Sequence, residues 1–542
     1  MSKKICIFLA GFLIIAAGIN QEVNIYDEGV AVSNAQRILA GELPYRDFWP
    51  GTYPVGQYYL LALMFHFFGS SLKIMRLTDI VFRAGLVMIF YSLIRRISSG
   101  SLSAIISSLI LSFWLASIGF WGVPIFPALF FGFLSIVFLL KFVNARQYYW
   151  LILSGILNGL SIIFRHDIGV FIWVTSVFSV AAFDFHLIFI KKKKIKNKLF
   201  LQAVSIVLFA LFSFLPIGMT TGILVFSGSE LYKIWESLII FPVSVYSKFA
   251  RLPYPPFFFV PANFKFTADF LLIYLKYLLT RWSTFYLPFF IFIGGLHWSF
   301  GKKKFIYEIW TLSIFGIFLF WLSLQRADNI HILPALIPAL AVFAIFIDKL
   351  IFRRNYKLII LILFWGLLTG MFQSLIISPV IIWLNIVKTA PIWRCNSQLP
   401  AAGCVFVSSD QEKAVRYIQT HTISSEPIFV GNLRHDKIFV NDVMFYFLAQ
   451  RKIAVGYHIF VPGMTTTKPF QEQMISELIK RSVNYVVLSS RFSHISEPNE
   501  RSKSSGVTLI DDFIRENYQV EAIFWEYTIL RRESNQVLVN PN

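Results

Sequence analysis

Charged side chains are scarce in this sequence. Only 14% of its 542 residues are Asp, Glu, Lys or Arg, whereas 56% are hydrophobic, 59 are Phe and the mean hydropathy is +0.65. Such a chain has too little charge to cover a water-soluble surface, and its apolar runs recur near the roughly 20-residue length that crosses a bilayer. The composition excludes a soluble globular protein and predicts a polytopic membrane protein.

Cysteine is also scarce, because the chain contains only Cys6, Cys395 and Cys404. Their spacing does not fit a cysteine-based metal centre. Cys395 and Cys404 can pair if they face an oxidising compartment, and the sequence leaves this open. We expect no function that depends on a disulfide.

Nucleotide-binding motifs are missing from the carboxy-terminal part of the chain. Residues 385–542 contain neither a glycine-rich phosphate loop nor a dinucleotide fingerprint,. We therefore expect catalysis in the membrane part.

The net charge of +20 suggests a nucleic-acid-binding protein until its position is considered. Residues 388–542 carry 17 Lys and Arg against 15 Asp and Glu, so the excess lies in the apolar part. There the basic residues form short clusters between apolar runs: Lys3-Lys4, Arg95-Arg96, 191–198, Lys302 to Lys304 and Arg353-Arg354. This is the positive-inside pattern that orients membrane helices, and it offers no continuous basic groove. No nucleic-acid partner is expected.

The apolar runs predict about eleven transmembrane helices. Ten lie at roughly 76–97, 102–119, 123–143, 148–164, 168–190, 199–226, 284–300, 305–324, 332–351 and 357–384. The remaining segment, residues 5–19, is either a signal peptide or the first helix, and we favour an uncleaved anchor. The basic clusters place the amino terminus in the cytoplasm and residues 385–542 outside the plasma membrane, the bacterial inner membrane.

The composition changes after the last apolar run. GCVFVSS, EPIFVGN and YVVLSS are short β-rich runs, and helical patterns at 411–419, 442–450 and 470–481 alternate with them,. This alternation predicts a soluble α/β domain. The expected fold is an α-helical polytopic membrane domain over 1–384, followed by an extracytoplasmic α/β domain over 385–542.

An outer loop is expected over residues 20–75, with a helix at 58–68 lying along the membrane interface. Its stretch from Asn24 to Tyr59 concentrates ionisable and aromatic residues in a chain with few charges. Such a density at a membrane surface indicates a polar ligand, so we interpret the stretch as an active-site loop. The residues expected to meet substrate there are Asp27, Glu28, Glu42, Tyr45, Arg46 and Asp47.

A second outer loop is expected over residues 227–283. It contains Pro253, Pro255, Pro256 and Pro261 among aromatic residues and several cations. It is either a mobile lid over a lipid-facing cleft or an ordinary surface connection, and the sequence favours neither.

Two short outer turns also carry polar residues. One contains Arg165, His166 and Asp167, and the other contains Arg326, Asp328 and His331. Each turn alone is unremarkable for a surface connection, but together with Asp27 and Glu28 three polar sites converge on one face. Carboxylates there can deprotonate an acceptor or hold a divalent cation, while Arg and His can receive an anionic leaving group.

At this point the sequence resembles a known family. An amino-terminal span, an Asp-Glu pair, and then GELPYRDFWPGTYPVGQYYLLALMFHFFG before a span near Arg76 are similar to the GT-C superfamily of integral membrane glycosyltransferases. The similarity is greatest to the bacterial group related to protein O-mannosyltransferases and aminoarabinose transferases. FRHDIGVF and RADNIHILPALIP resemble the later polar loops of this group. NDVMFYFLAQRK and FQEQMISELIKRSVNYVVL resemble its soluble outer domain.

The resemblance implies that a sugar moves, with inversion, from a polyprenyl-phosphate donor to an acceptor hydroxyl on a glycan, lipid or protein. The catalytic residues that it implies are Asp27, which matches the acidic catalytic position, Glu28, which is its neighbour in the usual pair, and Asp167, which lies where a second acidic residue often occurs. No cofactor is certain; a divalent metal, with Asp27 and Asp167 as ligands, is one alternative. Polytopic lipid or glycan transport and a catalytically inactive scaffold remain the alternative functions.

Overall fold

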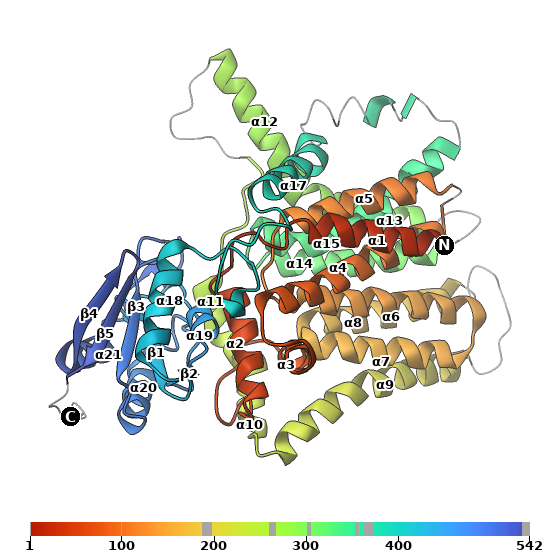
Figure 1. Cartoon of the computed structure of the whole chain (residues 1–542). Coiled ribbons are helices and arrows are strands. Elements are labelled where there is room, and N and C mark those ends of the chain that lie inside the picture. Colours follow the sequence, from red (N-terminus) through yellow and green to blue (C-terminus); the bar gives the residue numbers. More distant parts are fainter. Residues whose placement is uncertain are drawn as a thin grey trace.

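The computed structural model describes residues 2–98, 100–186, 198–258, 267–300, 305–352, 357–358, 360–362, 366 and 372–533. The basic clusters at 191–197, 302–304 and 353–354 lie outside these residues. Ten apolar helices form a bundle at one end of the molecule (Figure 1): α1 Lys3–Ala16, α4 Leu72–Arg95, α5 Leu102–Ser117, α6 Ile125–Ala145, α7 Tyr148–Phe164, α8 His166–Phe185, α9 Lys198–Phe226, α13 Leu287–Ser299, α14 Tyr307–Ser323 and α15 Asn329–Phe352.

The bundle follows the apolar runs of the sequence closely, because each run is long enough for a helix, and most of these helices bury aliphatic side chains against one another,. Five of the described helices are long and apolar enough to cross a membrane, and five shorter apolar helices accompany them. Of the eleventh predicted span, residues 373–377 form a π-helical turn and α17 covers Ser378–Thr389, but much of 357–384 lies outside the described residues.

The stretch interpreted as an active-site loop is partly helical. α2 spans Asp27–Leu39, and α3, at Gly56–Phe68, matches the predicted interfacial helix. Both lie between the bundle and the carboxy-terminal domain (Figure 1). The prediction of a loop over 24–59 was wrong for α2, because this helix is polar on average and gains its stability from packing rather than from an apolar run,.

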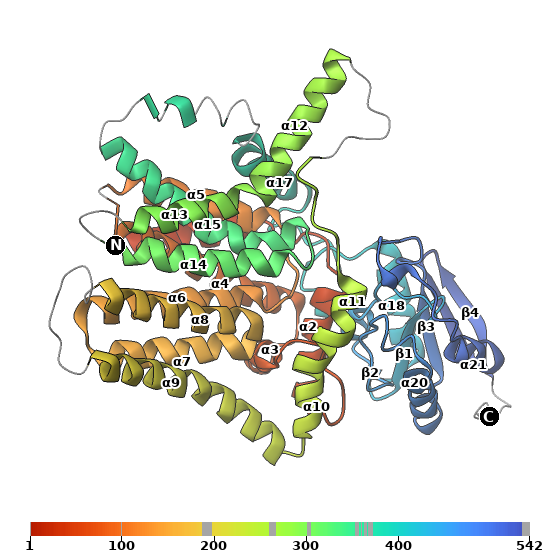
Figure 2. The same cartoon turned by 180° about the vertical axis from the view of Figure 1, so that it is seen from behind.

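The second outer loop also contains helices. α10 Leu231–Trp235, two π-helical turns at Glu236–Ile240 and Pro242–Tyr246, and α11 Ser247–Ala250 follow one another, and Figure 2 shows this segment beside α2. α12 covers Ala268–Phe285 and projects from the bundle. Residues 259–266 lie outside the described part, and the choice between a lid and a connection remains open.

The carboxy-terminal domain is an α/β sandwich with a five-stranded sheet in the order β2-β1-β3-β5-β4. Its strands are β1 Pro427–Asn432, β2 Lys452–Ile453, β3 Tyr485–Ser489, β4 Tyr518–Phe524 and β5 Tyr527–Arg532. Its helices are α18 Ser409–His421, α19 Met444–Ala449, α20 Lys468–Lys480 and α21 Leu509–Asn517. β1 and β3 pair in parallel, while β5 is antiparallel to both β3 and β4.

Two sequence expectations for this domain need correction or completion. GCVFVSS is not a strand of the sheet. Its residue Phe406 instead forms an isolated bridge with Glu22, so this backbone pairs with the segment that precedes α2. Cys395 and Cys404 form a disulfide near this bridge, so the pairing that the sequence left open is present.

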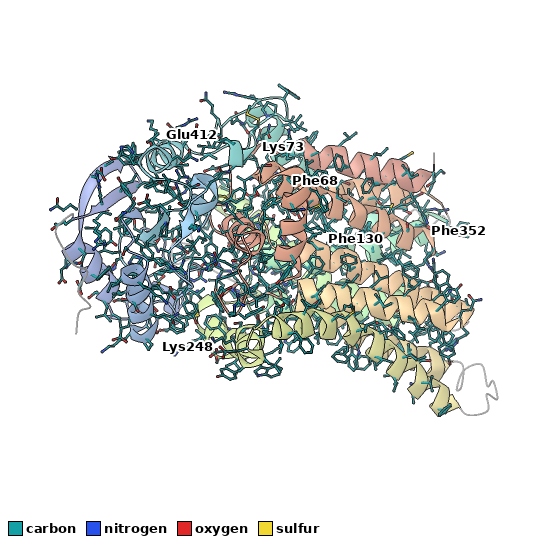
Figure 3. All side chains as sticks on the ribbon, turned by 60° about the horizontal axis from the view of Figure 1, so that its bottom comes forward. Phe68, Lys73, Phe130, Lys248, Phe352 and Glu412 are labelled. Atoms are coloured by element: carbon teal, nitrogen blue, oxygen red, sulfur yellow. A yellow bond between two sulfur atoms is a disulfide. The ribbon has the colours of Figure 1, made fainter. Side chains whose placement is uncertain are left out.

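One hydrophobic core joins α2 and α3 to the carboxy-terminal domain. Val32 and Ala35 of α2 and Leu61 of α3 are buried in the same cluster as Met444 and Phe445 of α19. A side chain at Gly29 would come within 2.5 Å of the Met444 backbone nitrogen, which shows how closely α2 and α19 approach. Figure 3 shows the resulting length of the molecule, with Glu412 on the carboxy-terminal domain, Phe130 in the bundle and Phe352 at its far end. The two parts are therefore packed as one body at α2.

Candidate active site

A polar cavity of about 530 Å³ lies where the bundle, α2 and the carboxy-terminal domain meet. Its wall comes from the start of α2, residues 49–58, the turn at 121–125, and the α14–α15 turn. The carboxy-terminal domain contributes 439–440, 459–461 and residues between 491 and 501. The ionisable side chains that line it are Asp27, Asp328, His331, Arg165, Arg326, Arg491 and Arg501. Cations thus outnumber carboxylates, which suits an anionic ligand.

Asp27 stands in the first turn of α2, and Asn24 fixes its side chain. The Asn24 Oδ1 accepts hydrogen bonds from the backbone nitrogens of Tyr26 (3.1 Å) and Asp27 (2.9 Å), which fixes the turn that leads into α2,. The Asn24 Nδ2 donates to the Asp27 Oδ2 at 3.1 Å. The other carboxylate oxygen has no protein donor in the described hydrogen bonds, and the residue lines the cavity.

The Asp27 carboxyl has a pKa close to neutrality. Burial raises this pKa from 3.8 to about 6, and the neighbouring Glu28 adds to the rise, while the bond from Asn24 and the charges of Arg501 and Arg326 oppose it,. A carboxylate with such a pKa is ionised at pH 7 and is basic enough to take a proton.

Glu28 points away from the cavity. Its carboxylate is fully buried and forms a bidentate pair with Arg76 of α4, at 2.8 Å and 2.7 Å. Arg76 also donates to the carbonyls of Ile19, Gln21 and Glu22. Glu28 thus ties α2 to α4, which assigns it a positioning role; the structure gives no support to its predicted contact with substrate.

The first short polar turn supplies one cavity residue. Arg165 lines the cavity, stacks on the Tyr53 ring at 5.2 Å and pairs with Asp167, whose oxygens lie 3.0 Å and 3.1 Å from its Nε. Asp167 and His166 are absent from the described cavity lining, although the sequence placed both in the site. Asp167 therefore contacts Arg165 and not the described cavity wall.

The second short turn lies directly on the cavity. Arg326 pairs with Asp328 at 3.1 Å and with Glu497 of the carboxy-terminal domain at 2.6 Å. Asp328 also contacts the His331 Nδ1 at 2.7 Å, and the hydrogen bond and charge of His331 lower the pKa of Asp328 despite burial. This turn joins the membrane bundle to the carboxy-terminal domain.

The remaining predicted residues lie outside this cavity. Glu42 pairs with Arg37 at 2.6 Å, and Arg46 pairs with Asp47 at 2.7 Å. Tyr45, Arg46 and Asp47 line a separate cleft of about 280 Å³, which shares Trp49 with the main cavity. The structure does not bring these residues to Asp27.

Sequence reasoning missed the cavity residues of the carboxy-terminal domain. No motif surrounds Arg491, Arg501 or Phe439. They lie more than 400 positions from Asp27 in the sequence, and nothing local predicts that they line the same cavity as Asp27. The turn at Trp121 and Gly122 was also missed: a side chain at Gly122 would come within 2.7 Å of the Glu28 Cα. A glycine two positions before Pro124 in an outer turn was the available clue.

The two predicted metal ligands, Asp27 and Asp167, lie in different surroundings. Among the described residues, no group of three or more His, Cys, Asp and Glu side chains is suitably placed for a metal ion. Asp27 lines the cavity, whereas Asp167 is turned towards Arg165. The divalent metal that the sequence raised as an alternative therefore stays a prediction.

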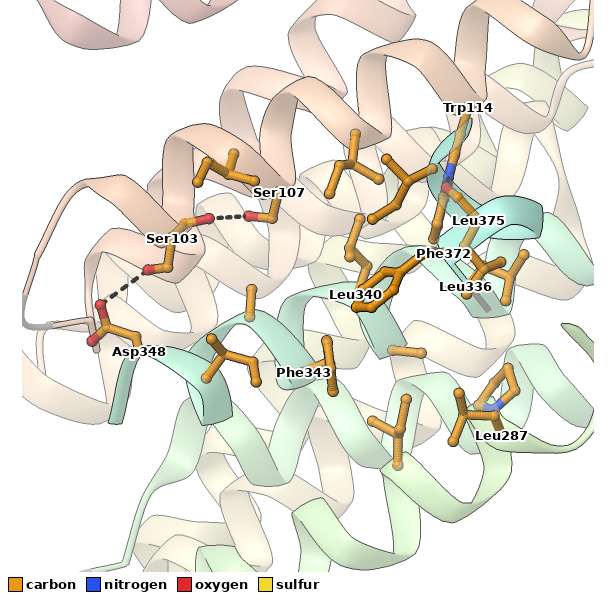
Figure 4. Close-up of a pocket in the computed structure, with 18 of the residues that line it drawn as sticks. Ser103, Ser107, Trp114, Leu287, Leu336, Leu340, Phe343, Asp348, Phe372 and Leu375 are labelled. Carbon is orange, nitrogen blue, oxygen red and sulfur yellow. Dashed lines mark hydrogen bonds between the residues drawn. The ribbon is translucent and has the colours of Figure 1, made fainter. Parts of the chain in front are cut away.

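A second large cavity, of about 510 Å³, lies inside the bundle (Figure 4). Aliphatic and aromatic side chains of α5, α13, α15 and residues 372–376 line it. Its one carboxylate, Asp348, accepts from Ser103 at 3.0 Å, at the end of the cavity in Figure 4. This cavity is suited to an apolar chain and offers no arrangement of groups for proton transfer.

Comparison with solved structures identifies the fold. ArnT from Cupriavidus metallidurans bound to undecaprenyl phosphate matches 99% of this chain and 98% of its own, with a TM-score of 0.53 and 13% identity. The fold is that of GT-C glycosyltransferases. ArnT of the same organism in the apo state matches 99% of each chain, with a TM-score of 0.50 and 12% identity. The GT-C fold here includes the carboxy-terminal domain, because the match extends over nearly the whole chain.

A weaker likeness covers part of the chain. The arabinosyltransferase EmbB from Mycobacterium smegmatis matches 64% of this chain and 30% of its own, with a TM-score of 0.41 and 12% identity. No protein-family model matches the sequence, and no curated protein matches it.

Proposed function

We propose that this protein is a membrane glycosyltransferase. It moves a sugar from a polyprenyl-phosphate donor to an acceptor hydroxyl of an envelope glycan, lipid or protein. The observation that carries the proposal is Asp27, a carboxylate with a pKa of about 6 in a cavity lined by arginines, within a GT-C fold. The similar ArnT structure contains undecaprenyl phosphate, which supports a donor of this class.

The proposed reaction is a displacement at the anomeric carbon. The acceptor oxygen forms the new bond to this carbon as the bond to the donor phosphate oxygen breaks, so the configuration inverts. Asp27 takes the hydroxyl proton, because a neutral hydroxyl is a poor nucleophile. The departing polyprenyl phosphate gains a negative charge, which the arginines of the cavity stabilise.

Several residues hold this arrangement without touching the reacting atoms. Asn24 orients the Asp27 carboxylate, the Glu28–Arg76 pair fixes the start of α2, and Asp167 orients Arg165. Arg326 is held by Glu497 and Asp328 at the cavity wall. Arg165 and Arg326 remain candidates for contact with phosphate, although each already has a carboxylate partner.

We place the reaction on the outer face of the membrane. The basic clusters of the sequence orient the helices, and the Cys395–Cys404 disulfide is consistent with an oxidising compartment on the side of the cavity,.

A transfer assay tests the proposed function. Purified protein, reconstituted with membranes from cells that lack it, is incubated with a panel of labelled polyprenyl-phosphate sugars, and label in lipids, glycans and proteins is measured. We expect label to move from one donor to one acceptor class. Movement of intact lipid between leaflets without sugar transfer would indicate a transporter, and binding without either would indicate an inactive scaffold.

A further inference from the structure

Arg501 is a buried arginine without a carboxylate partner at the wall of the polar cavity. It lies in a short 3-10 turn, Glu500–Ser502, of the carboxy-terminal domain and is 8% exposed. Its guanidinium stacks on the Phe439 ring at 5.0 Å, and its buried Nε has no hydrogen-bond partner. Its charge acts on Asp27 and Glu497 from a distance, but in the part of the chain that the structure describes no carboxylate lies within ion-pairing distance of it. An arginine left in this state is costly unless a ligand supplies the anion.

The other arginines of the cavity are already engaged. Arg326 contacts Glu497 and Asp328, and Arg165 contacts Asp167. Arg491 contacts Glu22 at 2.7 Å and Glu526 at 3.8 Å. Arg501 is therefore the cavity arginine whose planar fork is available to an incoming anion.

The turn that carries Arg501 is fixed to the membrane part of the protein. Asn499 accepts from the Arg501 backbone nitrogen at 3.1 Å and donates to Glu497 at 2.8 Å and to the Arg251 carbonyl at 3.3 Å. Glu497 in turn binds Arg326 at 2.6 Å. These contacts fix the turn, and the Phe439 ring packs against the guanidinium, so less order has to be gained when a ligand arrives,.

We infer that Arg501 binds the phosphate group of a lipid substrate in this cavity, so that the carboxy-terminal domain completes the active site. The inference rests on the proposed function and adds a residue to it. Arginine can donate two parallel hydrogen bonds to phosphate oxygens, and it favours the phosphate more strongly as this group gains charge on leaving. The phosphate belongs either to the donor or to a phosphorylated acceptor lipid, and these share the same chemistry.

Lipid binding to the full-length protein tests the inference. The protein is placed in nanodiscs of neutral phosphatidylcholine, and binding is measured for polyprenyl phosphate against the matching polyprenol. A phosphorylated glycolipid against its dephosphorylated form makes the second pair. We expect Arg501→Gln to weaken binding of the phosphorylated member of one pair by about 10- to 100-fold and to leave its phosphate-free member unchanged. The affected pair identifies the lipid.

Matched variants separate recognition from folding. Arg501→Lys keeps the charge but not the fork, so we expect it to recover part of the lost preference. Arg515→Gln removes an exposed charge, paired with Asp512, from the same domain and should keep the full preference. If the wild type and Arg501→Gln prefer the phosphorylated lipid to the same degree in both pairs, the proposed role of Arg501 is wrong. The proposed donor is not affected by that result. A wild-type protein that does not distinguish polyprenyl phosphate from polyprenol would instead contradict the proposed donor.

Discussion

Asp27 and Glu28 are adjacent in sequence and occupy opposite environments. Asp27 faces the cavity with one oxygen held by Asn24, while Glu28 is fully buried against Arg76. The helical turn separates the two side chains by roughly 100° around the axis, so one can face substrate while the other anchors the helix. Substitution of Asp27 should therefore affect the transfer reaction, whereas substitution of Glu28 should affect stability.

The acid limb of the transfer reaction should report the pKa of Asp27. Because burial raises this pKa to about 6 and the ionised carboxylate is the active form, kcat/KM should be half-maximal near pH 6, level off above about pH 7 and approach a tenfold fall per pH unit below about pH 5,. Asn24→Ala removes a hydrogen bond that lowers the pKa, so the limb should move to higher pH. A profile that is flat from pH 7 to pH 4.5 would show that Asp27 is not the base.

Glu28→Gln should act on stability first. The substitution leaves the Arg76 charge buried without its partner, which typically costs about 3–5 kcal/mol,. Thermal unfolding in detergent should therefore show a large loss of stability. An unchanged unfolding temperature together with loss of transfer would return Glu28 to the catalytic role that the sequence suggested.

Among the elements, apolar helices were predictable from the sequence and α2 was not. The spans at 76–97 and 123–143 correspond to α4 and α6, because hydrophobic length alone specifies a membrane helix,. α2 contains charged and small residues, and its packing partners lie more than 400 positions away on α19. For the same reason Asp27 could be proposed from local sequence, whereas Arg501 could not.

The turn at Gly122 should control the position of α2. Its φ of +62° favours glycine, and a side chain there would meet the Glu28 Cα at 2.7 Å and the Asp27 carbonyl at 3.0 Å,. Gly122→Ala should therefore shift the start of α2 and lower the transfer rate by about 10²-fold. Gly41→Ala is the matched control, because its φ is +87° and nothing lies within 4 Å of the added atom. Equal activity of the two variants would contradict the role of the turn.

On the scale of the whole molecule, residues 1–384 and 385–542 differ in amino-acid composition, but they share one hydrophobic core. The buried faces of α2 and α19 belong to one cluster, and Arg326 and Glu497 connect the two parts across the cavity. The sequence predicted both parts and could not predict their contact, because that contact depends on non-local packing. The site therefore exists only where the parts meet.

Thiol labelling of intact cells should reveal on which side this junction lies. After replacement of Cys6, a cysteine introduced at Ser504 should react with a membrane-impermeant reagent, because residue 504 is exposed on the domain placed outside. A cysteine at Gln147, exposed between α6 and α7, should not react. Labelling at Gln147 and not at Ser504 would reverse the proposed orientation.

Sugar transfer by the Asp27→Asn variant tests the central claim most directly. The amide is close in size to the carboxylate but cannot accept the acceptor proton, so we expect the transfer rate to fall by about 10²–10⁴-fold. The variant should keep the wild-type unfolding temperature and its binding of polyprenyl phosphate. Transfer at the wild-type rate by Asp27→Asn, measured with the same labelled donor and acceptor, would contradict the account.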